Sequence, residues 1–114
     1  MHTSPYDYQP SPLIEQQAKI FKALGHPSRL VMVNALRAGT QCVCELQALV
    51  GADMSTVSKH LSVLREAGIV TSQKKGTSIY YSLALPCLDT FLQCTGSLVQ
   101  SHSLLPKAMP PHAD

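Results

Sequence analysis

The sequence contains no tryptophan and little aromatic character or charge. Aromatic residues make up 5% of the 114 positions, which argues against an aromatic-lined groove that stacks on sugars or bases. Charged residues make up 14%, whereas a typical globular domain has about 25%. We therefore expect a partner, a second copy of the chain, to cover part of this surface.

Membrane, export and enzyme signatures are also missing. No apolar run approaches the roughly 18 residues of a membrane span, and residues 1–12 have neither the basic nor the apolar segment of a secretion signal. These absences predict a cytoplasmic protein with reduced thiols and no membrane partner. There is no Cys-x-x-Cys motif, no βαβ pattern and no glycine-rich phosphate loop, so the sequence predicts no enzyme.

The length fits a single domain, because most domains have roughly 100–150 residues. With 45% apolar residues, the centre of the chain has enough hydrophobic surface to fold. The two ends carry several prolines and little that packs. We expect residues 1–12 to be a flexible arm, residues 13–104 the domain and residues 105–114 a flexible tail.

Apolar residues recur at helical spacing through the first two thirds of this domain. Proline favours a first helical turn, glycine favours a helix end, and aspartate favours an N-cap. These signals predict helices from about Leu13 to Leu24, from Pro27 to a stop at Gly39, from Val43 to Val50, and from an N-cap at Asp53 to a stop at Gly68.

The hydrophobic period then changes from 3.6 to 2. Residues 69–73 and 77–83 read as strands joined by Lys74-Lys75-Gly76, which predicts a hairpin. A last helix over 86–102 has apolar residues at near-heptad spacing, which predicts packing against a second copy. The fold class is therefore mainly α with a small β-hairpin, a dimeric winged helix-turn-helix.

The helix that begins after Asp53 has the features of a DNA-reading helix. Its apolar stripe, Val57, Leu61 and Leu64, leaves short hydroxyl side chains facing outward, and these allow close approach to the major groove. Between Leu13 and Leu83 eight basic residues oppose four acidic ones, a net charge of +4, which suits contact with phosphates. The predicted DNA-binding residues are Ser55, Thr56, Ser58, Lys59, His60, Lys74 and Lys75.

The segment Cys42-Val43-Cys44 is the most informative for ligand chemistry. Cys42 falls at the N-cap of the helix 43–50, and Glu45 takes the capping-box position. Because an N-cap residue is not helical, both sulfurs can turn to the same side of the helix start. A helix N-terminus favours an anion, so we expect a lowered thiol pKa here. Two thiolates held together suit a soft ion.

Cys87 and Cys94 are the candidates for a further sulfur ligand. They are seven residues apart on the last helix, and hence on one of its faces. Cys87 follows Pro86 at the helix start, where we expect the greater exposure. Cys94 fits equally well as a small core residue.

Three segments resemble the ArsR/SmtB family: Ala23–Leu30, Val57–Val70, and Gly76 with Tyr80–Leu83. Members of this family are small dimeric bacterial repressors that leave DNA when they bind metal or metalloid ions, or when their thiols are oxidised. The resemblance implies that the helix after Asp53 reads DNA and that helices 13–24 and 86–102 form the dimer interface. A two-fold dimer presents its reading helices about 34 Å apart to an inverted-repeat operator in double-stranded DNA.

The thiol segment is similar to the Cys-Val-Cys-(Asp/Glu)-Leu-Cys pattern of the branch that senses arsenic and antimony, although Gln47 stands where that pattern has its third cysteine. The resemblance predicts As(III) or Sb(III) as inducer, with Cys42, Cys44 and Cys87 as ligands and Cys94 as second choice for the third. Zinc, nickel and cobalt sensors use a ladder of His and Glu on the last helix, which here offers Asp89 and His102. A Cd(II) or Pb(II) sensor, a redox or persulfide switch, and a dimeric module without DNA binding stay open.

Overall fold

The computed structural model describes residues 9–102. The chain forms two compact units, the first ending at Ala84 and the second beginning at Leu85. Within residues 9–102 no helix combines the length and the hydrophobicity that a membrane crossing needs. Residues 9–12 of the predicted arm are described, whereas residues 1–8 are not. The predicted tail, residues 105–114, lies wholly outside the described residues.

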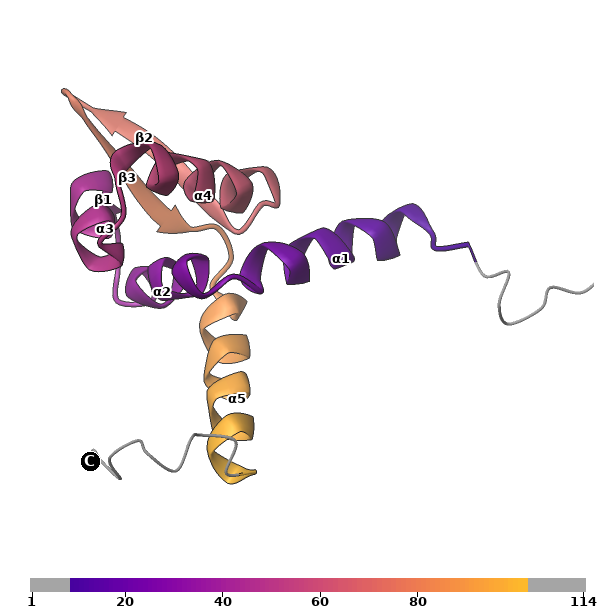
Figure 1. Cartoon of the computed structure of the whole chain (residues 1–114). Coiled ribbons are helices and arrows are strands. Elements are labelled where there is room, and N and C mark those ends of the chain that lie inside the picture. The colour runs from indigo at the N-terminus through magenta and orange to yellow at the C-terminus, as the bar shows by residue number, and fades with distance from the viewer. Residues whose placement is uncertain (1–8, 103–114) are drawn as a thin grey trace, which may run out of the picture. The chain divides into compact units, whose positions relative to one another are not determined.

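The first unit contains four helices and a small sheet (Figure 1). In chain order its elements are α1 (Pro12–Leu24), α2 (Pro27–Leu36), β1 (Gln41–Cys42), α3 (Val43–Val50), α4 (Met54–Glu66), β2 (Val70–Lys75) and β3 (Ser78–Leu83). The second unit contributes α5 (Cys87–Ser101). The predicted fold class, mainly helical with a winged helix-turn-helix arrangement, is confirmed.

Side-chain caps explain why the helices begin where they do. Ser11 accepts a hydrogen bond from the Ile14 N–H at 3.2 Å at the start of α1, and His26 Nδ1 accepts one from the Ser28 N–H at 3.1 Å at the start of α2. α3 ends at Gly51, whose φ of 77° is left-handed and favours glycine. That turn is short, so α4 follows α3 after only Gly51 and Ala52 before its N-cap.

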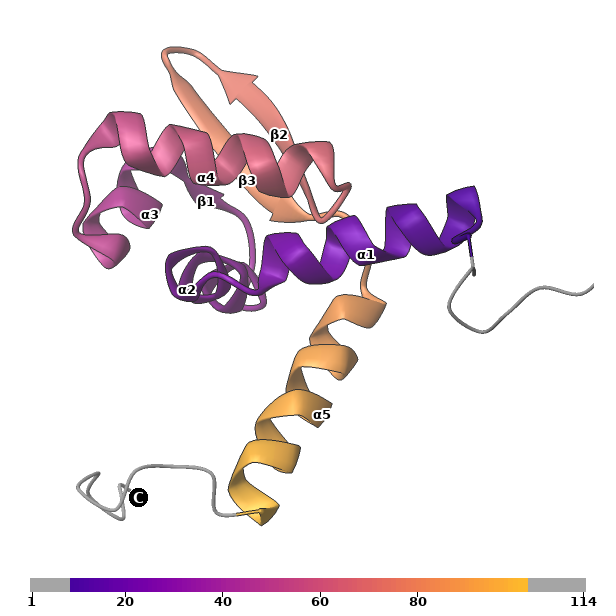
Figure 2. The same cartoon turned by 45° about the vertical axis from the view of Figure 1, so that its right-hand side comes forward.

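The sheet has the order β1-β3-β2, and both pairings are antiparallel. β2 and β3 form the predicted hairpin, in register from Val70 opposite Leu83 to Lys75 opposite Ser78. Its turn projects away from the helices in both views (Figures 1 and 2). β1 was not predicted, because a two-residue strand has no period of its own and forms only where β3 offers a free edge.

Two other boundaries differ from the sequence prediction. α2 ends at Leu36 instead of continuing to Gly39, and a short turn with an N–H to O bond from Gly39 to Leu36 follows it. In the hairpin, β2 extends to Lys75 and β3 begins at Ser78. The basic residues expected in the turn therefore lie on β2 itself. Helix ends are the least certain part of a pattern-based assignment, since terminal turns continue the hydrogen bonding past the last helical residue.

The core of the first unit is apolar throughout: no polar or charged residue among those described is buried. α4 contributes its predicted stripe of Val57, Leu61 and Leu64, each at most 1% exposed. α4 packs against α2, α3 and β2. The other elements of the unit contribute further buried residues, namely Met32, Val33 and Leu36 of α2, Leu46 of α3, and Ile69, Val70 and Tyr81 of the sheet region. Burial of one face of α4 therefore fixes which face points outward.

A polar contact also joins α4 to the start of α2. The rings of His26 and His60 lie with their centroids 4.4 Å apart, and Arg29 Nη1 is 3.3 Å from His60 Nδ1. Partial burial lowers the pKa of His60 below its ordinary value, and electrostatic interactions with His26 and Arg29 lower it further. A neutral His60 is therefore the form that this packing favours.

We expect Leu61→Ala to lower the free energy of unfolding by about 2–5 kcal/mol, because it leaves a cavity under α4. Urea denaturation followed by circular dichroism measures this change. Val63→Ala is the matched control, since Val63 lies two residues away on α4 and is 39% exposed. Equal losses in the two variants would contradict the assignment of this face to the core.

The His60 contact predicts a pH dependence of stability. Because the folded protein holds His60 at a lowered pKa, the unfolded chain binds the proton more readily once the pH falls below about 6.5. Stability should then decline from pH 6.5 toward pH 5, and His60→Gln should make this decline shallower. Urea titrations across this range measure it, with His102→Gln as control. An identical decline in wild type and His60→Gln would refute the prediction.

Candidate functional site

The start of α4 is held by the predicted aspartate cap. Asp53 Oδ1 accepts a hydrogen bond from the Thr56 N–H at 2.7 Å. This bond and the Thr56 hydroxyl lower the pKa of the Asp53 carboxyl, and the charge of Lys59 lowers it further. The carboxylate is therefore ionised at neutral pH and keeps the first turn of α4 in place.

The outward face of α4 presents the predicted hydroxyl and amine groups. The side chains opposite the buried stripe are all exposed: Ser55, Thr56, Ser58, Lys59 and Ser62. Such short side chains allow a helix to approach base edges, and Lys59 can reach a phosphate. This surface, with the tip of the hairpin, is the candidate nucleic-acid interface.

His60 does not share the exposed position of its neighbour Lys59. Its ring is half-buried in the contact with His26 and Arg29, so it positions α4 on α2. Direct contact of His60 with DNA stays a prediction, and the structure gives this ring a different set of partners.

The hairpin carries Lys74 and Lys75, both exposed, next to its turn. Lys75 Nζ lies 5.6 Å from the centre of the Tyr80 ring across the hairpin, which supports its side chain near the tip. Gly76 has a φ of 62°, a conformation that the tight turn needs and that glycine adopts readily.

The sequence did not predict a further contact of the hairpin: Arg65 Nη1 of α4 donates to Ser72 Oγ of β2 at 3.3 Å. It ties the β2–β3 hairpin, the wing of the fold, to α4.

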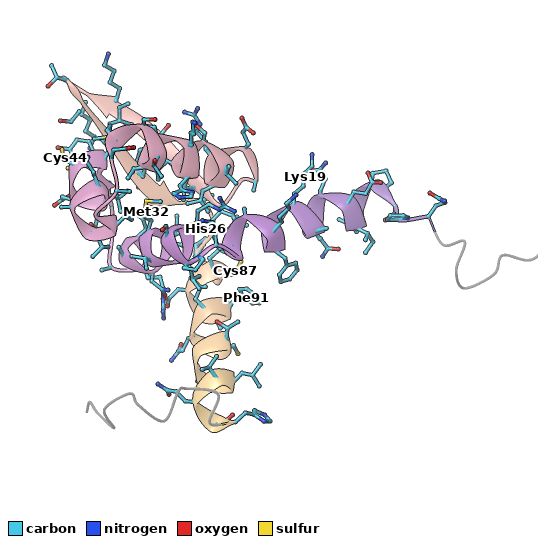
Figure 3. All side chains as sticks on the ribbon, viewed as in Figure 1. Lys19, His26, Met32, Cys44, Cys87 and Phe91 are labelled. Atoms are coloured by element: carbon cyan, nitrogen blue, oxygen red, sulfur yellow. The ribbon has the colours of Figure 1, made fainter. Side chains whose placement is uncertain are left out.

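The structure brings Cys42 and Cys44 together at the start of α3. Their sulfur atoms are 3.4 Å apart, and Figure 3 labels Cys44 at this end of the unit. Cys42 is the N-cap, with a ψ of 160°, and its N–H donates to Glu45 Oε1 at 2.8 Å in a capping box. The predicted orientation of both thiols to one side of the helix start is confirmed.

The expected lowering of the thiol pKa is wrong for Cys42. The Glu45 N–H lowers the pKa of this thiol, but the Cys44 thiol, desolvation and the Glu45 carboxylate together raise it above its ordinary value. The main reason is the neighbouring Cys44 thiol, and desolvation and the Glu45 carboxylate of the capping box add to its effect. Cys42 is therefore a protonated thiol at neutral pH.

The thiol pair is connected to both elements that are predicted to contact DNA. Cys42 ends β1 and pairs with Tyr80 of β3, which is a strand of the wing. Gln41 Nε2 donates to the Ala35 carbonyl of α2 at 2.8 Å. On the other side, α3 leads through Gly51 and Ala52 to the N-cap of α4. The pairing with β3 could not be read from the sequence, because it depends on a strand that is 38 residues away.

The remaining ligand candidates lie outside this pair. Gln47, at the position of the third cysteine in the resembling pattern, is half-buried and donates to the Ala52 carbonyl at 3.4 Å. Cys87 and Cys94 are both exposed on α5, in the second unit, so neither is a core residue there. Among residues 9–102 no group of three or more His, Cys, Asp or Glu side chains is arranged to hold a metal ion.

Comparison with known proteins agrees with this description. The family model for a bacterial regulatory protein of the arsR family matches residues 26–72, which span α2 to the start of β2. An HTH-type transcriptional regulator of Methanocaldococcus jannaschii is 41% identical over 68 residues, which are 59% of this chain and 76% of that protein. A transcriptional repressor SmtB homolog of Synechocystis is 41% identical over 70 residues, 61% of this chain and 53% of that protein.

A solved structure is similar over most of the chain. The homodimeric winged helix-turn-helix DNA-binding domain of Mb0332 from Mycobacterium bovis aligns with a TM-score of 0.74 and 25% identity, covering 85% of this chain and 90% of that one. The relatives are DNA-binding transcriptional regulators and not enzymes. The chain described here belongs to the arsR family of bacterial regulatory proteins.

Proposed function

We propose that this protein is a cytoplasmic repressor that leaves its operator when Cys42 and Cys44 bind a thiophilic metalloid, arsenite or antimonite. The observation that carries the proposal is the pair of sulfur atoms 3.4 Å apart at the start of α3. Family membership supports the coarser part, a transcriptional repressor that responds to metal ions in general. The thiol pair supports the choice of a soft ligand.

The spacing of the two sulfurs suits a shared ion. With bonds of about 2.3 Å, two sulfurs on one ion are about 3.3 Å apart at a right angle and about 3.8 Å apart at the tetrahedral angle. The observed 3.4 Å lies within this range, so binding requires little movement of the thiols. Cys87 is our first choice for a third sulfur, and Cys94 the second.

Release from DNA requires that the ligand bind the DNA-free conformation more tightly than the DNA-bound one. The thiol pair is well placed to produce such a difference, because α3 is joined to α4 by a two-residue turn and β1 pairs with the wing strand β3. A shift at Cys42 thus reaches the reading helix and the wing together.

The DNA complex that we propose is a homodimer on an inverted repeat. α1 exposes Leu13 and Phe21, and α5 exposes Leu98, at 69%, 59% and 56% respectively, and exposed apolar side chains on short helices favour association. The similar Mb0332 domain is homodimeric. Two copies of α4 about 34 Å apart then enter successive major grooves.

A redox or persulfide switch is the second candidate function. Cys87 and Cys94 are exposed and therefore accessible to oxidants. A disulfide within Cys42-Val43-Cys44 is strained. The switch therefore needs a disulfide between Cys42 or Cys44 and one of the two α5 thiols. Mass spectrometry after polysulfide treatment separates the candidates, since only the switch yields such an intramolecular cross-link.

We expect arsenite to lower the affinity of the wild-type protein for the DNA upstream of its own gene by about 5- to 150-fold, the usual size of an allosteric coupling. Cys42→Ser and Cys44→Ser should bind that DNA normally and lose the response. Fluorescence anisotropy measures both quantities. Cys87→Ser and Cys94→Ser keep the pair intact, and they report whether α5 supplies the third sulfur. A Cys42→Ser/Cys44→Ser double variant that still releases DNA with arsenite would overturn the proposal.

The raised pKa of Cys42 predicts different pH dependences for arsenite and Cd(II). When a thiol binds the neutral acid As(OH)3, one S–H and one As–OH bond break, one As–S bond forms, and water leaves. Cd(II) instead displaces the thiol protons. Its affinity for two thiols should therefore fall by up to about 100-fold for each unit by which the pH is lowered. Ultraviolet sulfur-to-ligand absorbance between about pH 6 and pH 8 measures both affinities. Parallel curves would show that arsenite also needs ionised thiols.

A further inference from the structure

A basic pocket lies between α1, α2 and α4, apart from the residues assigned so far to DNA or to the inducer. Its volume is about 310 Å³, and Lys19, Lys22 and Arg29 line it together with Val63, Glu66 and Ala67. Three basic residues and one acidic residue are thus among those that line it. All of these residues belong to the first unit.

Arg29 is fixed in this pocket without a carboxylate partner. Its Nε donates to the Ala23 carbonyl at 2.7 Å and its Nη2 to the Lys22 carbonyl at 3.4 Å, while Nη1 lies 3.3 Å from His60 Nδ1. The two carbonyls belong to the last turn of α1, where helix carbonyls need outside donors. The guanidinium is therefore held in place, and its charge is not neutralised by these neutral partners.

Lys19 and Lys22 are exposed and stand three residues apart, on one face of α1. Within residues 9–102 neither makes an ion pair with Glu66 or with another carboxylate. Figure 3 shows Lys19 projecting from α1 to the side on which α4 lies. The pocket therefore has an excess of positive charge directed toward the same side of the unit as the reading helix.

The α4 wall of the pocket continues the DNA-facing surface. Glu66 follows Ser55, Lys59 and Ser62 along one face of the helix, at spacings of four, three and four residues. α4 has 13 residues and is about 20 Å long, whereas the major groove is about 12 Å wide. A helix that crosses the groove with its first turns inside therefore brings its last turns to the sugar-phosphate backbone at the groove edge.

From this geometry we infer that the pocket formed by Lys19, Lys22 and Arg29 binds a phosphate of the operator backbone beside the groove that α4 enters. Lys19 and Lys22 donate to the phosphate oxygens, and Arg29 supplies a fixed positive charge behind them. Glu66 opposes the phosphate and limits the affinity. The inference rests on the DNA-binding part of the proposed function, and it adds α1 to the DNA interface.

The dependence of DNA affinity on salt tests this role, because each phosphate contact contributes about 0.9 to the slope of log affinity against log salt concentration. We expect Lys19→Gln and Lys22→Gln each to reduce the slope by up to about 0.9 per DNA-bound protomer, and to weaken binding by up to about tenfold at 0.1 M salt, because the two lysines share one phosphate. Glu66→Gln should act in the opposite direction and strengthen binding. Fluorescence anisotropy with a duplex from upstream of the gene measures all three.

Arg37→Gln is the matched control, since it removes the same charge at the far end of α2, where Arg37 donates to Asn34 Oδ1 at 3.1 Å. It should leave the slope unchanged. Slopes for Lys19→Gln and Lys22→Gln equal to that of wild type would overturn the inference. So would equal changes in Arg37→Gln, because these would reflect net charge alone.

Inorganic phosphate at matched ionic strength distinguishes a free anion from the DNA backbone as the occupant. If phosphate shifts the nuclear magnetic resonance signals of Lys19 and Lys22 while the salt slopes of their variants equal that of wild type, the pocket binds a free anion and the inference is wrong. A wild-type protein that does not bind the duplex at all would instead refute the proposed function. The two failures are therefore distinguishable.

Discussion

The burial of one stripe of α4 is the constraint on which the rest of the first unit depends. Val57, Leu61 and Leu64 are almost completely removed from solvent in a core that contains no buried polar residue among those described. A helix held on one face has its opposite face determined, so Ser55 and Lys59 must point outward. The cap at Asp53 and the contact of His60 with α2 then fix where the helix begins and how it is anchored.

The start of α3 combines two roles that are usually separate. A serine, threonine or aspartate ordinarily caps a helix, whereas here a thiol occupies the N-cap and Glu45 completes the capping box. The same residue ends β1 and pairs with the wing strand. A ligand that binds the Cys42 sulfur therefore acts on a residue that is both a helix cap and a strand partner. This arrangement connects the proposed inducer site directly to both elements that are predicted to contact DNA.

The positive charge of the first unit is spread over more elements than the reading helix and the wing. Lys59 lies on α4 and Lys74 on β2, but Lys19 and Lys22 lie on α1. An arginine held by neutral carbonyls and a histidine keeps further charge between these helices. A flexible lysine beside a fixed arginine suits a ligand such as phosphate, which accepts hydrogen bonds from several directions.

The sequence by itself determined the elements whose signals are local: the amphipathic stripe of α4, the caps at Asp53 and Cys42, the glycine that ends α3 and the hairpin. Only the tertiary structure decided the features that depend on distant residues. The strand β1 forms because β3 pairs with it. His60 turns inward because it contacts His26, the N-cap of α2, and Arg29 of α2. The pKa of Cys42 rises because the fold places the Cys44 thiol, and to a smaller extent the Glu45 carboxylate, beside its sulfur. Periodicity reports which face of an element is buried, but it carries no information on which partner meets that face.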